Sequence, residues 1–294
     1  MQEFLQLTLG GISAGLIYSA IALSLVLIWR GTRVLNYAQG GMAMFTSYIA
    51  FIVIQHTGNY WLGFVLALAA GFVLGAVLER TVVRQVTGKP PLNAVIVTIG
   101  LLILLEGLAG LLFGTNYRSF PPAYSVSGLH IGSVALGINR DDLFTAVAVL
   151  AAAGLLAITF QYTPVGLRLR ATAFNPSVAR LLGVRVGRML TLGWALAGLL
   201  GALAGLLVTP STFLYPNSMD TIFVYGFTAA VIGGLDSPGG AVVGGLLLGI
   251  ALSYAGGYLP SGASLVPVVA LGILVLVLMV RPDGLFSATQ VRRV

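Results

Sequence analysis

The stretch TPVGLRLRATAFNPSVARLLGVRVGR, residues 163–188, is a polar interval that contains five arginines and no acidic residue. Pro164 suits the first position of a helix, because the N–H that proline lacks needs no partner there. Asn175 followed by Pro176 has the form of an N-cap and a first helical residue, and Gly183 suits the position just after a helix end. The stretch therefore predicts two short helices that meet at a sharp turn, an ordered element between long apolar segments.

The composition on either side of this stretch places the chain in lipid. Of its 294 residues 58% are hydrophobic and 8% are charged, and the mean hydropathy is +1.00. A soluble domain carries roughly a quarter charged residues. The sequence has no cysteine, which excludes disulfides and thiolate metal sites. The formal net charge of +7 comes from basic residues in the loops between apolar segments, so it indicates topology rather than nucleic-acid binding.

The apolar residues form nine segments along the chain. A membrane span needs roughly 20 residues, with about 17 as the lower limit, so the segments 221–235 and 264–280 are marginal. Ser237 to Gly240 is a turn signal, so the pair of segments around it forms either two full spans or a short half-span followed by a longer helix. The predicted fold class is an all-α polytopic membrane protein with about eight or nine transmembrane helices. The segments are 7–29, 37–54, 61–79, 92–113, 143–160, 189–209, 221–235, 240–258 and 264–280.

The distribution of basic residues gives the chain an orientation. If the 163–188 stretch is inside, the inner loops hold thirteen lysines and arginines and the outer loops hold two, Arg118 and Arg140. Inner loops of membrane proteins carry such an excess. We therefore expect the amino terminus outside, the carboxy terminus in the cytoplasm, and a single transmembrane domain over residues 1–294. The longest outer loop, 114–142, is long enough for a short hairpin or helix.

Three motifs in the chain resemble one family. They are LNYAQGGMAM at 35–44, GLRLRATAFNPSVARLLGV at 166–184 and FTAAVIGGLDSPGGAVVGG at 227–245. Together they are similar to permease subunits of branched-chain amino acid ABC transporters, the LivH type, in which the 163–188 stretch is the cytoplasmic coupling segment. Asp236 is one departure, because a small residue, usually glycine, is expected there. The resemblance extends over essentially the whole chain.

The resemblance implies an ABC importer permease fold in the bacterial plasma (inner) membrane. It also implies a second homologous permease subunit, two cytoplasmic ATPase subunits that bind ATP and Mg, and an extracytoplasmic substrate-binding protein. The chain itself would then hold no cofactor and would not be an enzyme. The implied substrates are leucine, isoleucine and valine. Related permeases handle urea, short amides or other amino acids, so the identity of the substrate stays open.

The two short helices on the cytoplasmic side are the expected contact with the ATPase. We expect residues 173–180 to sit in a groove of that subunit, with Arg168 and Arg170 positioning the segment. The alternative is a solvated loop held inside by its charge. The expected coupling residues are Arg168, Arg170, Ala173, Asn175, Pro176, Ala179, Arg180 and Gly183.

Polar residues inside apolar segments are costly to bury, so function is the first hypothesis for each of them. Glu106 is the one carboxylate well inside a segment, with no basic residue in a segment to pair with it. It is a neutral group hydrogen-bonded to a neighbouring helix, a proton or cation site, or a polar point on the substrate path. Asn36 and Gln39 either cap the second segment or line an inner mouth. The candidate path residues are Asn36, Gln39, Met42, Thr46, Thr98, Glu106, Thr228 and Ser237.

Other function classes find little support in the sequence. Lys89, in VTGKPP, lacks the upstream glycine and the hydroxyl residue of a phosphate-binding loop, so ATP would have to bind to another polypeptide. His56 and His130 fall in separate loops without acidic partners, and we expect no metal site. An ion-coupled transporter that uses Glu106 is an alternative, although such proteins carry more ionisable residues and two matched halves. A membrane-embedded enzyme would need a catalytic constellation that the sequence lacks.

Glycines recur four residues apart, at 71/75, 201/205, 240/244 and 245/249. Small residues at this spacing let helix backbones approach closely in lipid. We expect these ridges to pack within the chain, with a subunit interface as the alternative.

Overall fold

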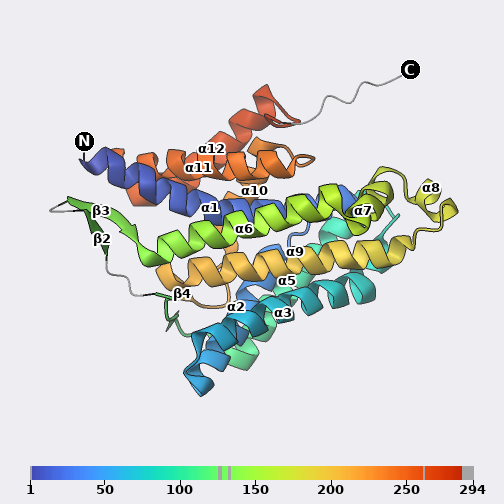
Figure 1. Cartoon of the computed structure of the whole chain (residues 1–294), viewed down its shortest axis with the longest axis horizontal. Coiled ribbons are helices and arrows are strands. Elements are labelled where there is room, and N and C mark those ends of the chain that lie inside the picture. Colours follow the sequence, from blue (N-terminus) through green and yellow to red (C-terminus); the bar gives the residue numbers. More distant parts are fainter. Residues whose placement is uncertain (1, 125–127, 132–133, 261, 287–294) are drawn as a thin grey trace.

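The computed structural model describes residues 2–124, 128–131, 134–260 and 262–286, and these residues are mainly helical. Each of the nine apolar segments forms a helix, and the basic stretch forms two short ones, as its capping residues predict (Figure 1). Arg292 and Arg293, which count toward the predicted charge bias, lie outside the described residues. The apolar helices are α1 (Gln2–Thr32), α2 (Gln39–Thr57), α3 (Tyr60–Leu78), α5 (Pro91–Phe113), α6 (Arg140–Tyr162), α9 (Val186–Val208), α10 (Asp220–Gly233), α11 (Pro238–Tyr258) and α12 (Gly262–Val280).

Short elements extend or join these helices. The two helices of the basic stretch, residues 163–188, form a helical hairpin at one end of the bundle, and we call this end of the molecule the hairpin end (Figure 1). The longest loop contains the hairpin of strands that was one of its two predicted forms. A second strand pair, β1 with β4, ties the loop after α5 to the loop after α9. The bounds are η1 (Glu79–Val83, a π-helix), α4 (Arg84–Val86), α7 (Pro164–Phe174), α8 (Pro176–Leu181), η2 (Thr209–Ser211), β1 (Arg118–Ser119), β2 (Gly128–Ile131), β3 (Val134–Asn139) and β4 (Phe213–Leu214).

Six helices in the described part of the chain are long and apolar enough to cross a membrane. They are α1, α3 with its extension to Val86, α5, α6, α9 with its extension to Ser211, and α11. Helix α10 has 14 residues, which span about 21 Å, short of the roughly 30 Å hydrocarbon core. Of the two alternatives for this region, the structure has the short helix followed by the longer one. The apolar part of α12, Ser264–Val280, is also short.

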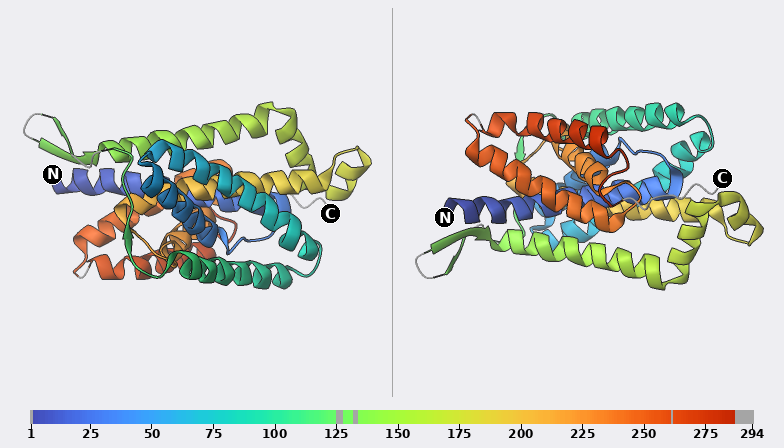
Figure 2. Two further views of the ribbon diagram at one scale, coloured as in Figure 1. Left: turned by 90° about the horizontal axis from the view of Figure 1, so that it is seen from below. Right: turned by 90° about the horizontal axis from the view of Figure 1, so that it is seen from above.

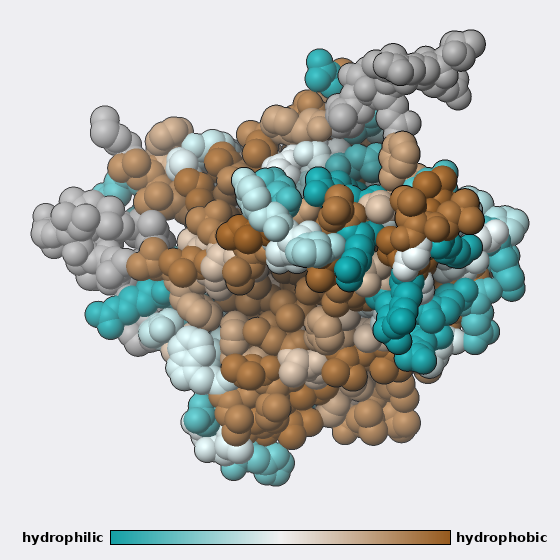
Figure 3. Space-filling model, turned by 45° about the vertical axis from the view of Figure 1, so that its right-hand side comes forward, coloured by the Kyte–Doolittle hydropathy of each residue, from teal (hydrophilic) through white to brown (hydrophobic). Residues whose placement is uncertain are grey.

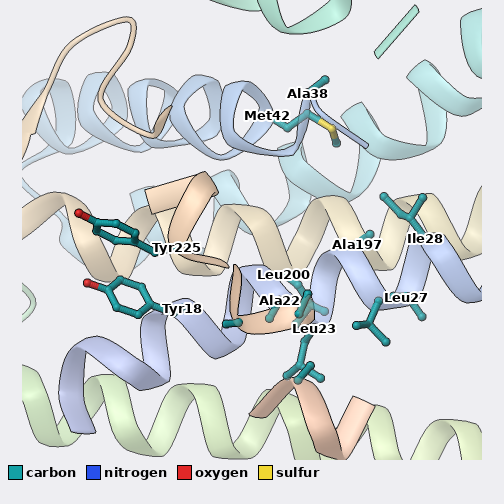
Figure 4. Close-up of a cluster of buried hydrophobic side chains, with 14 of the residues drawn as sticks. Tyr18, Ala22, Leu23, Leu27, Ile28, Ala38, Met42, Ala197, Leu200 and Tyr225 are labelled. Atoms are coloured by element: carbon teal, nitrogen blue, oxygen red, sulfur yellow. The ribbon is translucent and has the colours of Figure 1, made fainter. Parts of the chain in front are cut away.

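Helices α1 and α9 form the centre of the bundle (Figures 1 and 2). Helix α11 packs along α1, α3 packs along α9, and α10 lies against α1 and α11. Every residue of α1 from Tyr18 to Ile28 is buried. Figure 4 shows part of this core, where Tyr18 meets Tyr225 of α10 with ring centroids 5.2 Å apart. Leu200 of α9 belongs to the same cluster, so the central helices share one apolar core.

Glycines bring the central helices into close contact. Gly71 of α3 faces the backbone of Gly198 in α9, and a Cβ at Gly71 would lie 2.6 Å from the Gly198 carbonyl oxygen. Gly205 faces α2, Gly244 faces α10 and Gly245 faces α1 in the same manner. Because helices can approach this closely only without a Cβ, the predicted ridges are confirmed as packing surfaces within the chain.

The outward faces of α3, α5, α6 and α12 are apolar. Large side chains such as Ile103, Leu155 and Val275 are exposed there. Figure 3 shows hydrophobic residues over much of the face in view, with the largest group of hydrophilic residues on its right and smaller groups along the other edges. Away from the hairpin end, the rings of Trp61 and Phe144 meet with centroids 5.6 Å apart. Aromatic rings commonly gather at the membrane–water interface, so the surface as a whole suits a lipid bilayer.

Candidate coupling hairpin and translocation route

The basic hairpin, residues 163–188, is held in shape by the predicted cap at Asn175 and by a second cap at Thr163. The Thr163 hydroxyl accepts a hydrogen bond from the Gly166 amide at 3.1 Å, where α7 begins. The Asn175 side-chain oxygen accepts bonds from the amides of Ser177 and Val178 at 3.0 and 3.1 Å, where α8 begins. Gly183 follows the end of α8 with a φ of +80°. The turn between α7 and α8 is therefore fixed by side-chain hydrogen bonds, and the predicted boundaries are confirmed.

Helix α7 is anchored to the bundle while α8 projects from it (Figure 1). A Cβ at Gly166 would collide with the backbone of Thr159 and Phe160, so α7 folds back directly onto the end of α6. Leu169 and Thr172 of α7 are buried against the bundle. In α8 the described residue that is buried is Ala179, one of the predicted coupling residues. The remaining predicted coupling residues are exposed or partly exposed, namely Arg168, Arg170, Ala173, Asn175, Pro176, Arg180 and Gly183.

The tip of the hairpin carries exposed apolar side chains that the sequence analysis did not single out. Phe174 is 94% exposed, Leu181 is 87% exposed and Leu182 is 76% exposed. They lie beside arginines, away from the lipid-suited faces of the long helices. The signal was present in the sequence as apolar residues within a basic, capped stretch, but only the fold shows that they point away from the core.

A basic cleft of about 430 Å³ lies next to the hairpin and is organised by a buried acid. Glu79, which is 1% exposed, accepts bonds from Arg84 Nε at 3.1 Å and from Arg84 Nη2 at 2.8 Å. The Thr191 hydroxyl donates to the same carboxylate at 2.7 Å, and Arg84 also donates to the Gly187 carbonyl at 2.8 Å. This network joins the end of α3 to the start of α9. The arginines around the cleft are Arg80, Arg84, Arg180, Arg185 and Arg188.

Glu79 is a second buried acid, at the end of an apolar segment rather than well inside one, and the sequence analysis did not select it. Glu79 is the last residue of the predicted segment 61–79. A charged residue at the end of an apolar run usually indicates that a loop begins there. In the structure the helix continues as a π-helical turn over Glu79–Val83, and the carboxylate turns inward. A glutamate followed by arginines at the end of an apolar run was the available signal.

The polar residues at the start of α2 satisfy one another inside the protein. The Asn36 side-chain amide donates to the Gln39 side-chain oxygen at 2.9 Å, and Gln39 donates to the Ala197 carbonyl in α9 at 2.9 Å. The Asn36 oxygen accepts the Ala38 amide at 3.1 Å, which fixes the turn that precedes α2. Both side chains are fully buried. Asn36 therefore holds the turn before α2 but does not cap the helix, whose N-cap residue, Ala38, has no side-chain cap.

The other predicted path residues are distributed over three helices and a turn. Met42 and Thr46 are buried in α2, and the Thr46 hydroxyl donates to the Met42 carbonyl at 2.9 Å. Thr98 of α5 and Thr228 of α10 are buried and also bond backbone carbonyls. Ser237 caps α11 by accepting the Gly240 amide at 3.0 Å. Each hydroxyl thus has a partner within the chain, as threonines in apolar helices often do.

Glu106 lies next to polar side chains from outside its own helix, which is compatible with the first of its three predicted interpretations. It is partly buried in α5, and the side chains of Asp220 and Asn217 lie within hydrogen-bonding reach of it. Asp220 opens α10, so the contact joins α5 to the start of the short helix. Sequence spacing could not show this pairing because 114 positions separate the two acids.

An apolar helical bundle with lipid-suited faces and an ordered basic hairpin at one end is the architecture of a multi-pass membrane protein. Residues 7–278 match the model of the family described as the permease component of the branched-chain amino acid transport system, and the chain belongs to that family. The family is a transport component and not an enzyme family. The resemblance that the three motifs indicate is therefore confirmed.

Relatives match this chain from end to end. It is 30% identical to the high-affinity branched-chain amino acid transport system permease protein LivH of Escherichia coli (strain K12), over 99% of this chain and 98% of that protein. It is 29% identical to the corresponding protein BraD of Pseudomonas aeruginosa, with the same coverage of each. Among solved structures, PsaBC from Streptococcus pneumoniae in complex with Fab has a TM-score of 0.50 at 17% identity, over 96% of this chain and 91% of that one, which is a likeness in fold.

Proposed function

We propose that this chain is the transmembrane permease subunit of an ATP-driven ABC importer for branched-chain amino acids. The family and the names of its relatives support the assignment. In this proposal the chain is one permease domain of about eight or nine spans in the bacterial plasma (inner) membrane. Its amino terminus is outside, and the hairpin end and carboxy terminus are cytoplasmic. Permeases for urea, short amides or other amino acids are the alternative within the same class.

The proposed assembly supplies what this chain lacks. A second homologous permease subunit pairs with it, and two cytoplasmic ATPase subunits bind ATP and Mg. An extracytoplasmic binding protein delivers the substrate, and no nucleic acid takes part. The basic loops of this chain face the inner leaflet and the ATPases, which accounts for the net charge of +7 without a polyanionic ligand.

The observation that carries the proposal is the apolar tip of the basic hairpin. Phe174, Leu181 and Leu182 are among the most exposed large apolar residues described, and they stand at a polar end of the molecule. Exposed apolar residues rimmed by polar ones mark sites of protein contact. The caps of α7 and α8 keep the tip rigid, and the direct contact of Gly166 with α6 connects it to a long helix. Such an element can transmit a displacement from an ATPase groove to the membrane helices.

Replacing Phe174 and Leu181 by serine tests this contact. Burial of the two side chains in an interface contributes about 3 kcal/mol, so retention of the ATPase by the purified permease should fall about a hundredfold. Phe213→Ser, at an exposed phenylalanine away from the hairpin end, is the matched control and should retain the ATPase. Undiminished retention by the double variant would remove the hairpin tip from the proposed interface.

Substitution of Asn175 and Pro176 by alanine addresses coupling rather than assembly. The change removes an N-cap worth about 1 kcal/mol and loosens the turn between α7 and α8. We expect the complex to stay in the membrane, while ATP hydrolysis proceeds without a matching uptake of substrate into proteoliposomes. Wild-type coupling in this variant would contradict the assigned role.

We further propose that the substrate passes along the second apolar segment and the stretch 227–245, which form α2, the end of α10 and the start of α11. A Cβ added at Gly40 of α2 would lie 3.1 Å from the Cβ of Phe223 in α10, so the two helices are in direct contact. Both stretches combine glycines with polar groups, a combination that tolerates membrane depth only where protein or water covers it. Helix α5, which carries Glu106, also packs against α2, because Gly41 faces Leu102 and Leu105. The proposed route residues are Asn36, Gln39, Met42, Thr46, Thr98, Glu106, Thr228 and Ser237.

The contact of Glu106 with Asp220 favours one second candidate, an ion-coupled transporter. Two neighbouring carboxyl groups on different helices are a group that a proton-coupling site would use. The same proteoliposomes distinguish the candidates. We expect uptake to require ATP and to ignore an imposed proton or sodium gradient, whereas gradient-driven uptake without ATP would establish the second candidate.

A further inference from the structure

A long apolar groove of about 680 Å³ lies between α1, α6 and α11. Helix α6 runs beside α1 in Figure 1 and packs against it. The walls of the groove are aliphatic side chains from the three helices. They include Leu23, Leu27, Leu150, Leu156, Ala157 and Val242. A groove with such walls, between helices that span the membrane, suits a hydrocarbon chain.

The groove has a basic mouth at the hairpin end. Arg30 of α1, Arg170 of α7 and the amide side chain of Gln161 line it there. The Arg30 guanidinium lies 5.9 Å from the centroid of the Phe160 ring, which holds it over the opening. Arg170, which was predicted to position the hairpin against the ATPase, lies at this opening together with Arg30.

The nearby acid does not neutralise this mouth. Asp236 forms its ion pair with Arg33, with Nη1 and Oδ1 2.5 Å apart. In the described part of the chain neither Arg30 nor Arg170 forms an ion pair, because the ion pairs there are Arg33 with Asp236 and Arg84 with Glu79. The mouth therefore carries excess positive charge next to an apolar groove. Arginines bind phosphate oxygens through charge-assisted hydrogen bonds, often two at a time.

We propose that the groove binds an anionic phospholipid, with its phosphate between Arg30 and Arg170 and an acyl chain along α1, α6 and α11. This inference rests on the proposed orientation, in which the hairpin end faces the cytoplasm. Basic pockets between helices on that side of a membrane are recognised sites for anionic headgroups. An acidic segment of an ATPase would satisfy the arginines, but it would leave the apolar groove unfilled. A phospholipid would both pair with the arginines and fill the apolar groove. It would also connect α1 to α6, the helix that leads into the basic hairpin.

Native mass spectrometry of the full-length chain in detergent tests the proposal without any ATPase, so its outcome is separate from that of the transport assays. The probes are dioleoylphosphatidylglycerol and dioleoylphosphatidylcholine at equal concentration. We expect the chain to retain the anionic lipid in preference to the zwitterionic one. Each arginine near a lipid phosphate contributes about a fivefold change in binding. Retention should therefore fall about fivefold in Arg30→Gln and in Arg170→Gln, and should persist in Arg168→Gln on the same helix.

A second variant tests the groove and leaves the arginines intact. A Cβ at Gly154 meets no atom within 4 Å, so Gly154→Phe places a ring in the groove without a clash at its base. This variant should lose the anionic lipid, and Gly154→Ala should keep it. Equal retention of both lipids would overturn the proposal. Displacement of the lipid by inorganic phosphate alone would also overturn it. Crosslinking of the assembled transporter would do the same if it showed a second copy of the chain or the ATPase in the groove.

Discussion

Glu79 shows how a single buried charge can organise an end of this bundle. Its carboxylate receives two bonds from Arg84 and one from Thr191, so each of its oxygens has a partner. The Arg84 side chain is 39% exposed, so water partly hydrates the guanidinium and the carboxylate bears most of the burial cost. The pair fixes the position of the loop after α3 relative to the start of α9, and hence the shape of the basic cleft.

Replacing Glu79 by alanine is expected to destabilise the protein by about 1–3 kcal/mol, because Thr191 and Arg84 lose their partner in a closed site. The partial exposure of Arg84 keeps the loss below that of a fully buried pair. Thermal unfolding of the purified chain in detergent measures the change. Glu3→Ala, at an exposed acid in the first turn of α1, serves as the control. If the double variant with Arg84→Ala loses as much as the two single variants added together, the two side chains are not coupled and the network is misassigned.

For single residues, the sequence predicts hydrogen bonds to near neighbours in the chain well and contacts with distant residues poorly. The caps at Thr163, Asn175 and Ser237 depend on residues two or three positions away, and Pro164, Pro176 and Gly183 mark the corresponding ends. The contact of Glu106 with Asp220 and the pair of Arg33 with Asp236 depend on how separate helices meet. No spacing rule reaches across 100 or more positions, so such contacts became visible only in the fold.

At the scale of whole helices, closely packed pairs hold the bundle together. Helices α3 and α9 approach so closely at Gly71 that the Gly198 carbonyl and the Ala202 methyl would meet any side chain there. In lipid, where apolar surfaces gain little by leaving the solvent, such contacts supply much of the attraction between helices. Helix α3 can therefore pack this closely on α9 only because residue 71 is glycine and has no Cβ.

Gly71→Ala should lower the stability by about 1–3 kcal/mol, since the obstacle is backbone and cannot rotate away. Gly100→Ala is the matched change in α5, where a Cβ meets nothing within 4 Å. That substitution should leave stability unchanged or raise it by up to about 1 kcal/mol through helix propensity. Both variants are compared by thermal unfolding in the same detergent. Equal effects of the two substitutions would show that helix propensity, and not close packing, governs the response.

The elements themselves follow from the sequence because each rests on a local pattern. All nine apolar segments form helices, and the two short helices begin at their predicted prolines. The length of α10 was left open, since an apolar run of 221–235 is compatible with either a span or a half-span. The helix begins at Asp220, a few residues after the strand β4, which pairs with the distant β1.

Over the whole molecule, burial divides the helices into a centre and a periphery. Helices α1 and α9 are largely enclosed, whereas α3, α5, α6 and α12 expose apolar faces to their surroundings. The proposed route lies in the enclosed part, along α2 and α10. Met42 and Thr228, one on each of these helices, have no exposed surface. The conformation described here therefore keeps this route closed, and passage of a substrate would require α2 and α10 to separate.

Cysteine substitution at Met42 and at Thr228 tests this enclosed route in a chain that has no native cysteine. Both side chains are fully buried, so a small polar thiol reagent should reach them in one nucleotide state of the assembled transporter and be excluded in another. Leu111→Cys on α5 is the control, because that position is 80% exposed on an apolar face. It should react with a lipophilic reagent and ignore the polar one regardless of ATP. If both route positions stay unreactive in every state while positions along α5 or α9 become labelled by the polar reagent, the substrate passes elsewhere.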